Sequence, residues 1–197
     1  MDLLLATRNS HKTREFRELL GAAFHVIDLT DLPGVEIPAE TGRTFAENAT
    51  LKAVGASQDR QSLVIADDSG LEVDALGGEP GIYSARYAGE NASDADNVNK
   101  LLGQLSTRKK DEHWFARFRC VIALAQDGKL LGTFEGTVEG RIVNLPRGRS
   151  GFGYDPVFQP NGFDQTFAEM PPELKNKVSH RAQAVAALRH ALREIGN

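Results

Sequence analysis

The sequence has few of the features that mark disulfide-bonded, membrane-spanning or nucleic-acid-coating proteins. Its single cysteine, Cys120, excludes an intramolecular disulfide and a cysteine-based zinc cage. The longest strongly apolar run, residues 120–125, is far too short to cross a bilayer. The 23 Lys and Arg are outnumbered by 27 Asp and Glu, which gives a net charge of −4. We therefore expect neither a nucleic acid nor a membrane as partner.

What is present is the composition of a globular protein. Hydrophobic residues make up 41% and charged residues 25% of the 197 residues, so a disordered or fibrous chain is a poor interpretation. This length is enough for one large domain or two small lobes with a sizeable core. Asp2 followed by a short apolar stretch does not resemble a signal peptide, and we expect a cytoplasmic location.

The order of the expected elements predicts an α/β fold with a mixed sheet. Apolar runs predict buried strands over residues 3–6 and 62–66, the second ending where Asp67, Asp68, Ser69 and Gly70 form a turn. Alternating residues over 117–124, followed by Asp-Gly, predict a hairpin whose second strand covers 129–143, with bends or bulges at its glycines. Capping patterns and apolar stripes predict helices over about 13–20, 44–57, 93–105 and 179–195, the last stopping at Gly196.

The polar turn at residues 7–12 is the first candidate for chemistry. It joins a strand end to a helix N-terminus, where backbone N–H groups and the helix dipole favour a phosphate, and Lys12 adds a point charge. It is not a Walker loop, because the glycine pattern is missing. The alternative is an ordinary strand–helix turn with Asn9 or Ser10 as N-cap.

Two adjacent acids, Asp67 and Asp68, directly follow a buried strand, where α/β folds place their ligands. Neighbours on an extended chain point to opposite sides, so we expect one carboxylate to face the ligand. Carboxylate oxygens suit Mg²⁺, and one carboxylate can take a proton from water. Glu40, in a loop ahead of a helix, is a further candidate metal ligand, whereas Glu47 has the spacing of a capping residue. The alternative is a turn with solvated acids.

Two later segments offer recognition groups. In residues 148–156, glycines allow close approach of backbone to a ligand, and Phe152 and Tyr154 can stack on a flat ring. Alternatively, one of these rings packs in the hydrophobic core. In residues 175–181, His180 and Arg181 fall in the first turn of a helix, where cations oppose the dipole unless an anionic or electron-rich group lies there. A solvated basic turn is the alternative.

Together these segments favour a metal-dependent enzyme that acts on a nucleotide. Two other classes stay open. A nucleotide- or RNA-binding module without chemistry would use the aromatic loop and basic turns, but it leaves Asp67 and Asp68 unexplained. A Maf-like pyrophosphatase acting on modified pyrimidine nucleotides is the third interpretation.

The sequence closely resembles the inosine/xanthosine triphosphate pyrophosphatase family, which hydrolyses nonstandard purine nucleotides. Six segments carry the resemblance in order: residues 6–12, 40–49, 66–71, 76–87, 151–156 and 175–181. The resemblance implies one domain over residues 1–197 with an elongated two-lobed α/β fold and the site in the cleft between lobes. It also implies a homodimer and Mg²⁺-dependent hydrolysis of ITP, dITP and XTP to the monophosphate and pyrophosphate, which would cleanse the nucleotide pool. One departure from the pattern is Arg8, where many relatives have glycine.

The same resemblance assigns roles to individual residues. Asp68 is the expected base and a magnesium ligand. From the residues themselves, we expect Glu40 or Asp67 to help Asp68 hold the ion. The residues expected to bind substrate are Thr7, Asn9, Lys12, Ser69, Phe152, Gly153, Tyr154, Asp155, Lys175, His180 and Arg181. We expect the last three cationic side chains to supply donors to the 6-oxo group that separates hypoxanthine and xanthine from adenine, because adenine would leave those donors unpaired.

Overall fold

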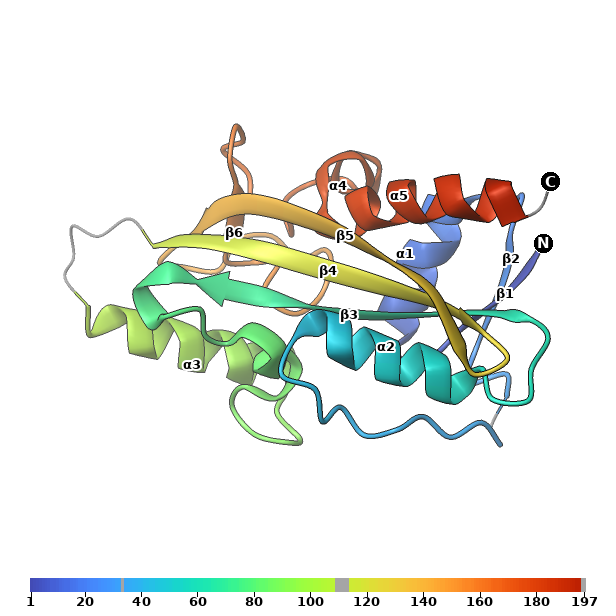
Figure 1. Cartoon of the computed structure of the whole chain (residues 1–197). Helices are drawn as coiled ribbons and strands as arrows, with labels where there is room; N and C mark the ends of the chain where they lie inside the picture. The colour runs from blue at the N-terminus through green and yellow to red at the C-terminus, as the bar shows by residue number, and fades with distance from the viewer. Residues whose placement is uncertain (33, 109–113, 196–197) are drawn as a thin grey trace. The chain divides into compact units, whose positions relative to one another are not determined.

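A computed structural model describes residues 1–32, 34–108 and 114–195, and it confirms an α/β fold with a mixed sheet (Figure 1). The strands are β1 (Asp2–Leu5), β2 (His25–Asp28), β3 (Leu63–Val73), β4 (Phe115–Gln126), β5 (Lys129–Ile142) and β6 (Phe158–Pro160). The α-helices are α1 (Ser10–Leu20), α2 (Phe45–Ala56), α3 (Asp94–Ser106), α4 (Pro172–Val178) and α5 (His180–Ile195). Two 3₁₀ helices, η1 (Asp74–Leu76) and η2 (Gly81–Arg86), follow β3.

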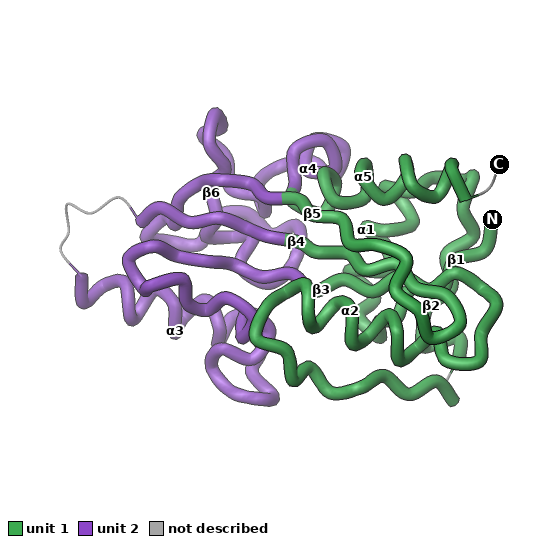
Figure 2. The backbone as a smooth tube through the Cα atoms, in the orientation of Figure 1, with its two compact units in different colours: residues 1–68, 120–136, 180–197 green, residues 69–119, 137–179 purple. Residues whose placement is uncertain are grey.

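The strands form one sheet in the order β2-β1-β3-β4-β5-β6. β1 is parallel to both β2 and β3, whereas β6 is antiparallel to β5. The chain divides into two compact units, drawn in different colours in Figure 2. Unit 1 holds residues 1–68, 120–136 and 180–197, and unit 2 holds residues 69–119 and 137–179. Each of the long strands β3, β4 and β5 is divided, with one part in unit 1 and the other part in unit 2. The single two-lobed domain stays a prediction.

Unit 1 is built on alternation in β1, β3 and β4. Leu3 and Leu5 belong to a buried cluster with Phe16 of α1 and Leu188 of α5, so these two helices cover one face of the strands. The alternate residues Leu4, Val64 and Ala66 are also buried. Helix α2 covers the other face of these strands, and its small buried residues allow it to lie close to them (Figure 1). Both faces of these strands are therefore apolar, as in parallel sheets covered on two sides.

Unit 2 has its own core. Apolar residues of the distal parts of β3, β4 and β5 join Val98, Leu101 and Leu105 of α3. Phe118, Phe158 and Phe167 lie within 6 Å of one another by ring centroid, in edge-on, stacked and tilted geometries. α3 begins as expected, because Ser93 and Asp96 form a complete capping box.

The structure corrects one expectation about elements and adds short elements that the sequence did not predict. The acidic segment is not a turn, because β3 continues through it to Val73. Strand β2 and helix α4 were not expected, since neither has a long apolar pattern. The expected hairpin turn is confirmed at Asp127 and Gly128, which have φ of 49° and 71°. Gly196 lies outside the described residues.

Two glycines of β5 permit close packing of the backbone. A Cβ on Gly136 would lie 2.1 Å from the His180 carbonyl oxygen, and one on Gly140 would lie 2.4 Å from the Gln159 carbonyl oxygen. Only glycine lets these backbones approach so closely.

Among the residues that are described, no helix combines the length and apolarity needed to cross a membrane.

Candidate active site

The predicted phosphate turn is held by its own side chains. The Asn9 side chain caps α1, because its Oδ1 accepts from the N–H groups of His11 at 3.0 Å and Lys12 at 3.2 Å. The Asn9 N–H in turn donates to Thr7 Oγ1 at 3.2 Å. Asn9 is therefore the N-cap of α1, as the ordinary-turn alternative expects, and its role in phosphate binding stays a prediction.

The unexpected cation of this turn, Arg8, is directed toward a neighbouring loop. Its guanidinium donates to the carbonyl oxygen of Val35 at 3.2 Å. Arg8 is exposed, and its contact fastens the turn to the segment that leads to α2.

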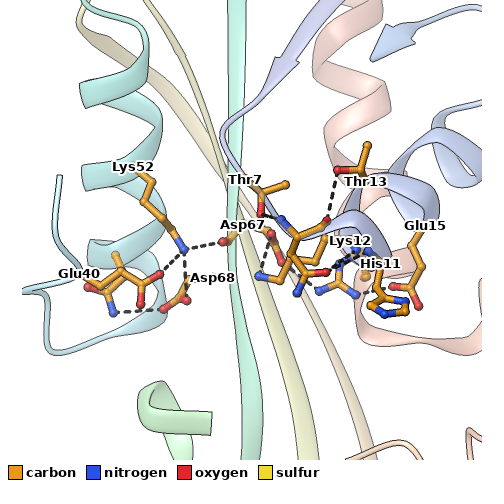
Figure 3. Close-up of polar contacts among 12 residues, drawn as sticks. Thr7, His11, Lys12, Thr13, Glu15, Glu40, Lys52, Asp67 and Asp68 are labelled. Carbon is orange, nitrogen blue, oxygen red and sulfur yellow. Dashed lines mark hydrogen bonds and ion pairs between the residues drawn. The ribbon is translucent and has the colours of Figure 1, made fainter. Parts of the chain in front are cut away.

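Asp67 and Asp68 point to opposite sides of β3, as neighbours on an extended strand must. The Asp67 carboxylate pairs with Lys12, whose Nζ lies 3.0 Å from Oδ1. The Asp68 carboxylate lies near Lys52, with 3.4 Å between Oδ1 and Nζ. Figure 3 shows Asp68 and Lys52 on one side of β3 and Lys12 on the other. The two acids thus have separate environments, although they are adjacent in sequence.

Asp67 belongs to a buried ionic network that joins three elements. Arg181 of α5 donates to Asp67 Oδ2 at 3.0 Å and to Glu15 Oε2 of α1 at 2.5 Å. Burial alone would raise the pKa of Asp67, but the charges of Lys12 and Arg181 hold it well below the usual range of an aspartate. Burial would likewise lower the pKa of Arg181, and its two acids raise it above its usual value. Asp67 is therefore ionised at neutral pH and forms ion pairs with both Lys12 and Arg181.

Asp68 has the opposite electrostatic character. Burial raises its pKa above the usual value, and the Glu40 charge adds to this, although Lys52 and a hydrogen bond from Asn48 act in the other direction. The Asn48 amide donates to Asp68 Oδ2 at 3.1 Å, and its own Oδ1 accepts from the Gly42 N–H at 2.8 Å. Asn48 thereby connects Asp68 to the loop that carries Glu40. A carboxylate that protonates more readily than usual suits a proton acceptor.

Glu40 and Asp68 have the donor chemistry for magnesium. Glu40 Oε1 lies 2.6 Å and Asp68 Oδ1 lies 3.4 Å from the same atom, Lys52 Nζ, so both carboxylates are directed to one place. Within the described ranges no group of three or more His, Cys, Asp or Glu forms a metal cage. Magnesium needs no such cage, since it is commonly held by one or two carboxylates together with water and substrate phosphates. The residues present fit this ion.

Glu47 is a capping residue, as its spacing predicts. The Thr44 hydroxyl accepts from the Glu47 N–H at 3.1 Å. The Glu47 carboxylate accepts from the N–H of Arg43 at 2.6 Å, one residue earlier than in a standard capping box.

Unit 2 contains a group of residues that were predicted to contact the purine base. Lys175 of α4 donates to Asp155 Oδ2 at 2.6 Å, and both side chains are buried. The Phe152 N–H donates to the same oxygen at 2.9 Å, and the Phe152 ring centroid lies 5.3 Å from Lys175 Nζ. Gly153 is half-buried and its N–H donates to Asp94 Oδ2 at 2.6 Å. The half-buried Phe152 ring therefore lies beside an ammonium, a cation–π arrangement.

Of the two aromatic rings, Tyr154 is the one that packs in the core, as the alternative interpretation expects for one of them. It belongs to the core of unit 2, and its hydroxyl donates to the Ser84 carbonyl oxygen at 2.8 Å. Burial raises the pKa of its phenol well above the usual value. Tyr154 is 3% exposed, so its ring offers no open face on which a ligand could stack.

The segment 175–181 is not a solvated basic turn. Lys175, His180 and Arg181 are all buried, and α4 and α5 meet at Ser179. The predicted site residues separate into two groups. Unit 1 contains Thr7, Asn9, Lys12, Glu40, Asp68, His180 and Arg181, whereas unit 2 contains Ser69, Phe152, Gly153, Tyr154, Asp155 and Lys175.

Sequence reasoning missed three residues of this site: Glu15, Asn48 and Lys52. All three are buried polar side chains on helices. A signal was present for Lys52, which lies on the same helical face as the buried Phe45, Ala49 and Ala56. A charged residue on an apolar helical face is rarely buried without a partner.

Comparison with known proteins gives one consistent family. A relative from Bacillus licheniformis named dITP/XTP pyrophosphatase is 48% identical over 188 residues, which is 95% of this chain and 95% of the relative. A relative of the same name from Bacillus subtilis is 46% identical over 188 residues, 95% of this chain and 94% of its own. The solved structure of the Staphylococcus aureus Ham1 protein has a TM-score of 0.85 and 42% identity, with 98% of this chain and 99% of that chain covered. The Ham1 family matches residues 3–191, and with this agreement in sequence and fold the chain belongs to the Ham1 family.

Proposed function

We propose that this protein is a magnesium-dependent pyrophosphatase that hydrolyses dITP, XTP and ITP to the monophosphate and pyrophosphate. Relatives named dITP/XTP pyrophosphatase, 46% and 48% identical over nearly the whole chain, support the reaction class and the purine substrates. The single structural observation that carries the proposal is the pairing of Lys12 with Asp67. Lys12 also acts on the neighbouring acid, because its charge lowers the pKa of Asp68, and this supports a polyphosphate at Lys12 within reach of that proton acceptor.

Magnesium would be held by Glu40 and Asp68. When bound, it supplies positive charge that offsets the negative charge of the triphosphate in the transition state. Oxygen ligands are the kind this ion prefers, and water and triphosphate oxygens would supply its other ligands.

The chain's own residues account for the remaining chemistry. A water oxygen attacks the α-phosphorus while Asp68 accepts a proton from that water, and the bond from the α-phosphorus to the bridging oxygen breaks. Pyrophosphate leaves with the electron pair of that bond. Lys12 and the positive end of the α1 dipole stabilise the charge that develops on this leaving group.

Recognition of the base would use Phe152 and Lys175. The Phe152 ring stacks on the purine, and the Lys175 ammonium is held close to that ring by Asp155. A donor directed at a 6-oxo group favours hypoxanthine and xanthine over adenine, because an adenine amino group would leave the buried donor unpaired. Arg181 has its terminal nitrogens on Glu15 and Asp67, so we assign it a positioning role within unit 1.

Such an activity would remove deaminated purine nucleotides before a polymerase incorporates them. The test is a panel of dITP, XTP, ITP, ATP and GTP, with and without MgCl₂, scored for pyrophosphate against free phosphate. We expect pyrophosphate from the first three substrates only with magnesium. Equal efficiency on ATP and ITP would contradict the base selection. Activity confined to modified pyrimidine nucleotides, or binding without any release of pyrophosphate, would contradict the proposed reaction.

A further inference from the structure

Lys52 is a buried cation in the acidic part of unit 1, and no predicted role covers it. It lies on the buried face of α2 and is 6% exposed. Lysine is almost never fully buried unless it is paired, because removing an ammonium from water is costly. The position therefore needs a reason that its partners can supply.

The Lys52 ammonium has three partners for its three N–H donors. Nζ lies 2.6 Å from Glu40 Oε1, 2.7 Å from the Asp67 carbonyl oxygen and 3.4 Å from Asp68 Oδ1. Figure 3 shows the lysine reaching from α2 to Glu40 and Asp68. Two of the partners are the carboxylates that we assign to magnesium, and the third is a main-chain carbonyl between the two acids.

An ammonium at this place opposes a second cation. Charges of like sign a few ångströms apart repel strongly in a partly buried site, where water screens them poorly. Glu40 and Asp68 also repel each other, so some cation must lie near them for the pair to stay ionised and close together. A lysine fixed by a carbonyl can provide that cation permanently.

We propose that Lys52 is a built-in counter-cation that holds Glu40 and Asp68 together without magnesium and weakens their affinity for the ion by competing for the same oxygens. The inference rests on the proposed function in one respect, the assignment of Glu40 and Asp68 as magnesium ligands. Its consequence is an order of binding. The free protein binds magnesium weakly, and the ion enters together with the triphosphate, whose oxygens supply the ligands that Lys52 withholds.

The test removes this charge while keeping the length and apolar stem of the side chain. Lys52→Met and wild-type protein are titrated with MgCl₂ alone by calorimetry at about pH 8, where carboxylates are ionised. We expect the variant to bind magnesium at least about tenfold more tightly, a change of about 1.4 kcal/mol. We also expect a lower melting temperature in EDTA and a larger rise on adding MgCl₂ than in wild type.

Three controls separate this role from a structural ion pair. Lys12→Met removes a cation that pairs with Asp67 and acts on Asp68 less strongly than Lys52 does, so its magnesium affinity should rise less than that of Lys52→Met. Lys52→Arg keeps the charge and should keep the weak affinity of wild type. Lys52→Met with Glu40→Gln should lose the gain. A structural lysine predicts instead that Lys52→Met is destabilised equally with and without the ion.

Magnesium affinity in Lys52→Met that equals or falls below that of wild type would overturn the proposal. A variant that stays unfolded in saturating MgCl₂ would overturn it too, because the divalent ion would then fail to replace the ammonium. Failure of the proposed function gives a different result. Wild-type protein that hydrolyses dITP in EDTA would refute the metal requirement itself, whereas the Lys52 comparison measures binding without substrate.

Discussion

The neighbouring acids Asp67 and Asp68 make a matched pair of substitutions with opposite expected effects. Asp67→Asn removes the carboxylate that Lys12 and Arg181 share. The two cations then lose this anionic partner within a buried network. Removing one member of a buried ionic group costs about 3–5 kcal/mol. Because a domain is stable by only about 5–15 kcal/mol, this loss is a large fraction of the total.

Asp68→Asn should behave differently. Burial and the Glu40 charge raise the pKa of this carboxyl, so its ionised form is disfavoured in the folded protein. A neutral asparagine relieves that cost, and we expect the free energy of unfolding to stay within about 1 kcal/mol of wild type or to rise. Catalytic efficiency on dITP should fall by about 10²–10⁴, the usual contribution of a general base.

The pH dependence of stability separates the two acids further. Asp67 has a lowered pKa when folded, so its stabilisation is complete above the unfolded value of about 3.9 and disappears as the pH falls below it. The stability difference between wild type and Asp67→Asn should therefore shrink on acidification. Asp68 has a raised pKa, so its cost exists at neutral pH and is relieved as the pH falls.

Urea unfolding from about pH 3 to 8 and pyrophosphate release from dITP measure these effects. A stability loss in Asp68→Asn as large as that in Asp67→Asn would refute the division of roles. Turnover of Asp68→Asn within about tenfold of wild type would refute its role as base.

Three further predictions concern other parts of the chain. Tyr154→Phe removes the hydrogen bond to the Ser84 carbonyl, so it should lower the free energy of unfolding by about 1 kcal/mol with little change in KM. Phe152→Ala should instead raise KM for dITP. A raised KM in Tyr154→Phe would contradict this, because it would show that the hydroxyl contacts the substrate. Gly136→Ala places a Cβ against the His180 carbonyl and should cost about 1–3 kcal/mol by urea unfolding, and an unchanged midpoint would contradict the packing argument. Light scattering after size exclusion should give twice the chain mass, the homodimer that the family resemblance implies, and a single-chain mass would contradict it.

Much of the local structure was predictable because it depends on short-range chemistry. Helices α2 and α3 begin close to their predicted positions, since Thr44 and Ser93 cap N–H groups a few residues ahead, whereas α1 begins three residues before the expected start because Asn9 caps it. The hairpin turn at Asp127 and Gly128 was identified from two residues, because both adopt the positive φ that such a turn requires. The α/β fold with a mixed sheet followed from the order of these elements.

The expected turn at Asp67 to Gly70 was wrong for a reason that no local pattern contains. Acids and glycine disfavour strands when their side chains face water. Here Lys12 and Lys52, brought from two different helices, supply a cation to each side of β3, and the strand continues through the acids.

The sequence by itself determined the fold class, the helix caps and the residue types of the candidate site, because each depends on neighbours within a few positions or on a recognisable family pattern. Only the tertiary structure decided that Asp67 is an anchored anion and Asp68 a carboxyl with raised pKa, that Tyr154 fills a core, and that Lys52 lies between the proposed metal ligands. These properties depend on burial and on charges distant in sequence, and both exist only once the chain has folded.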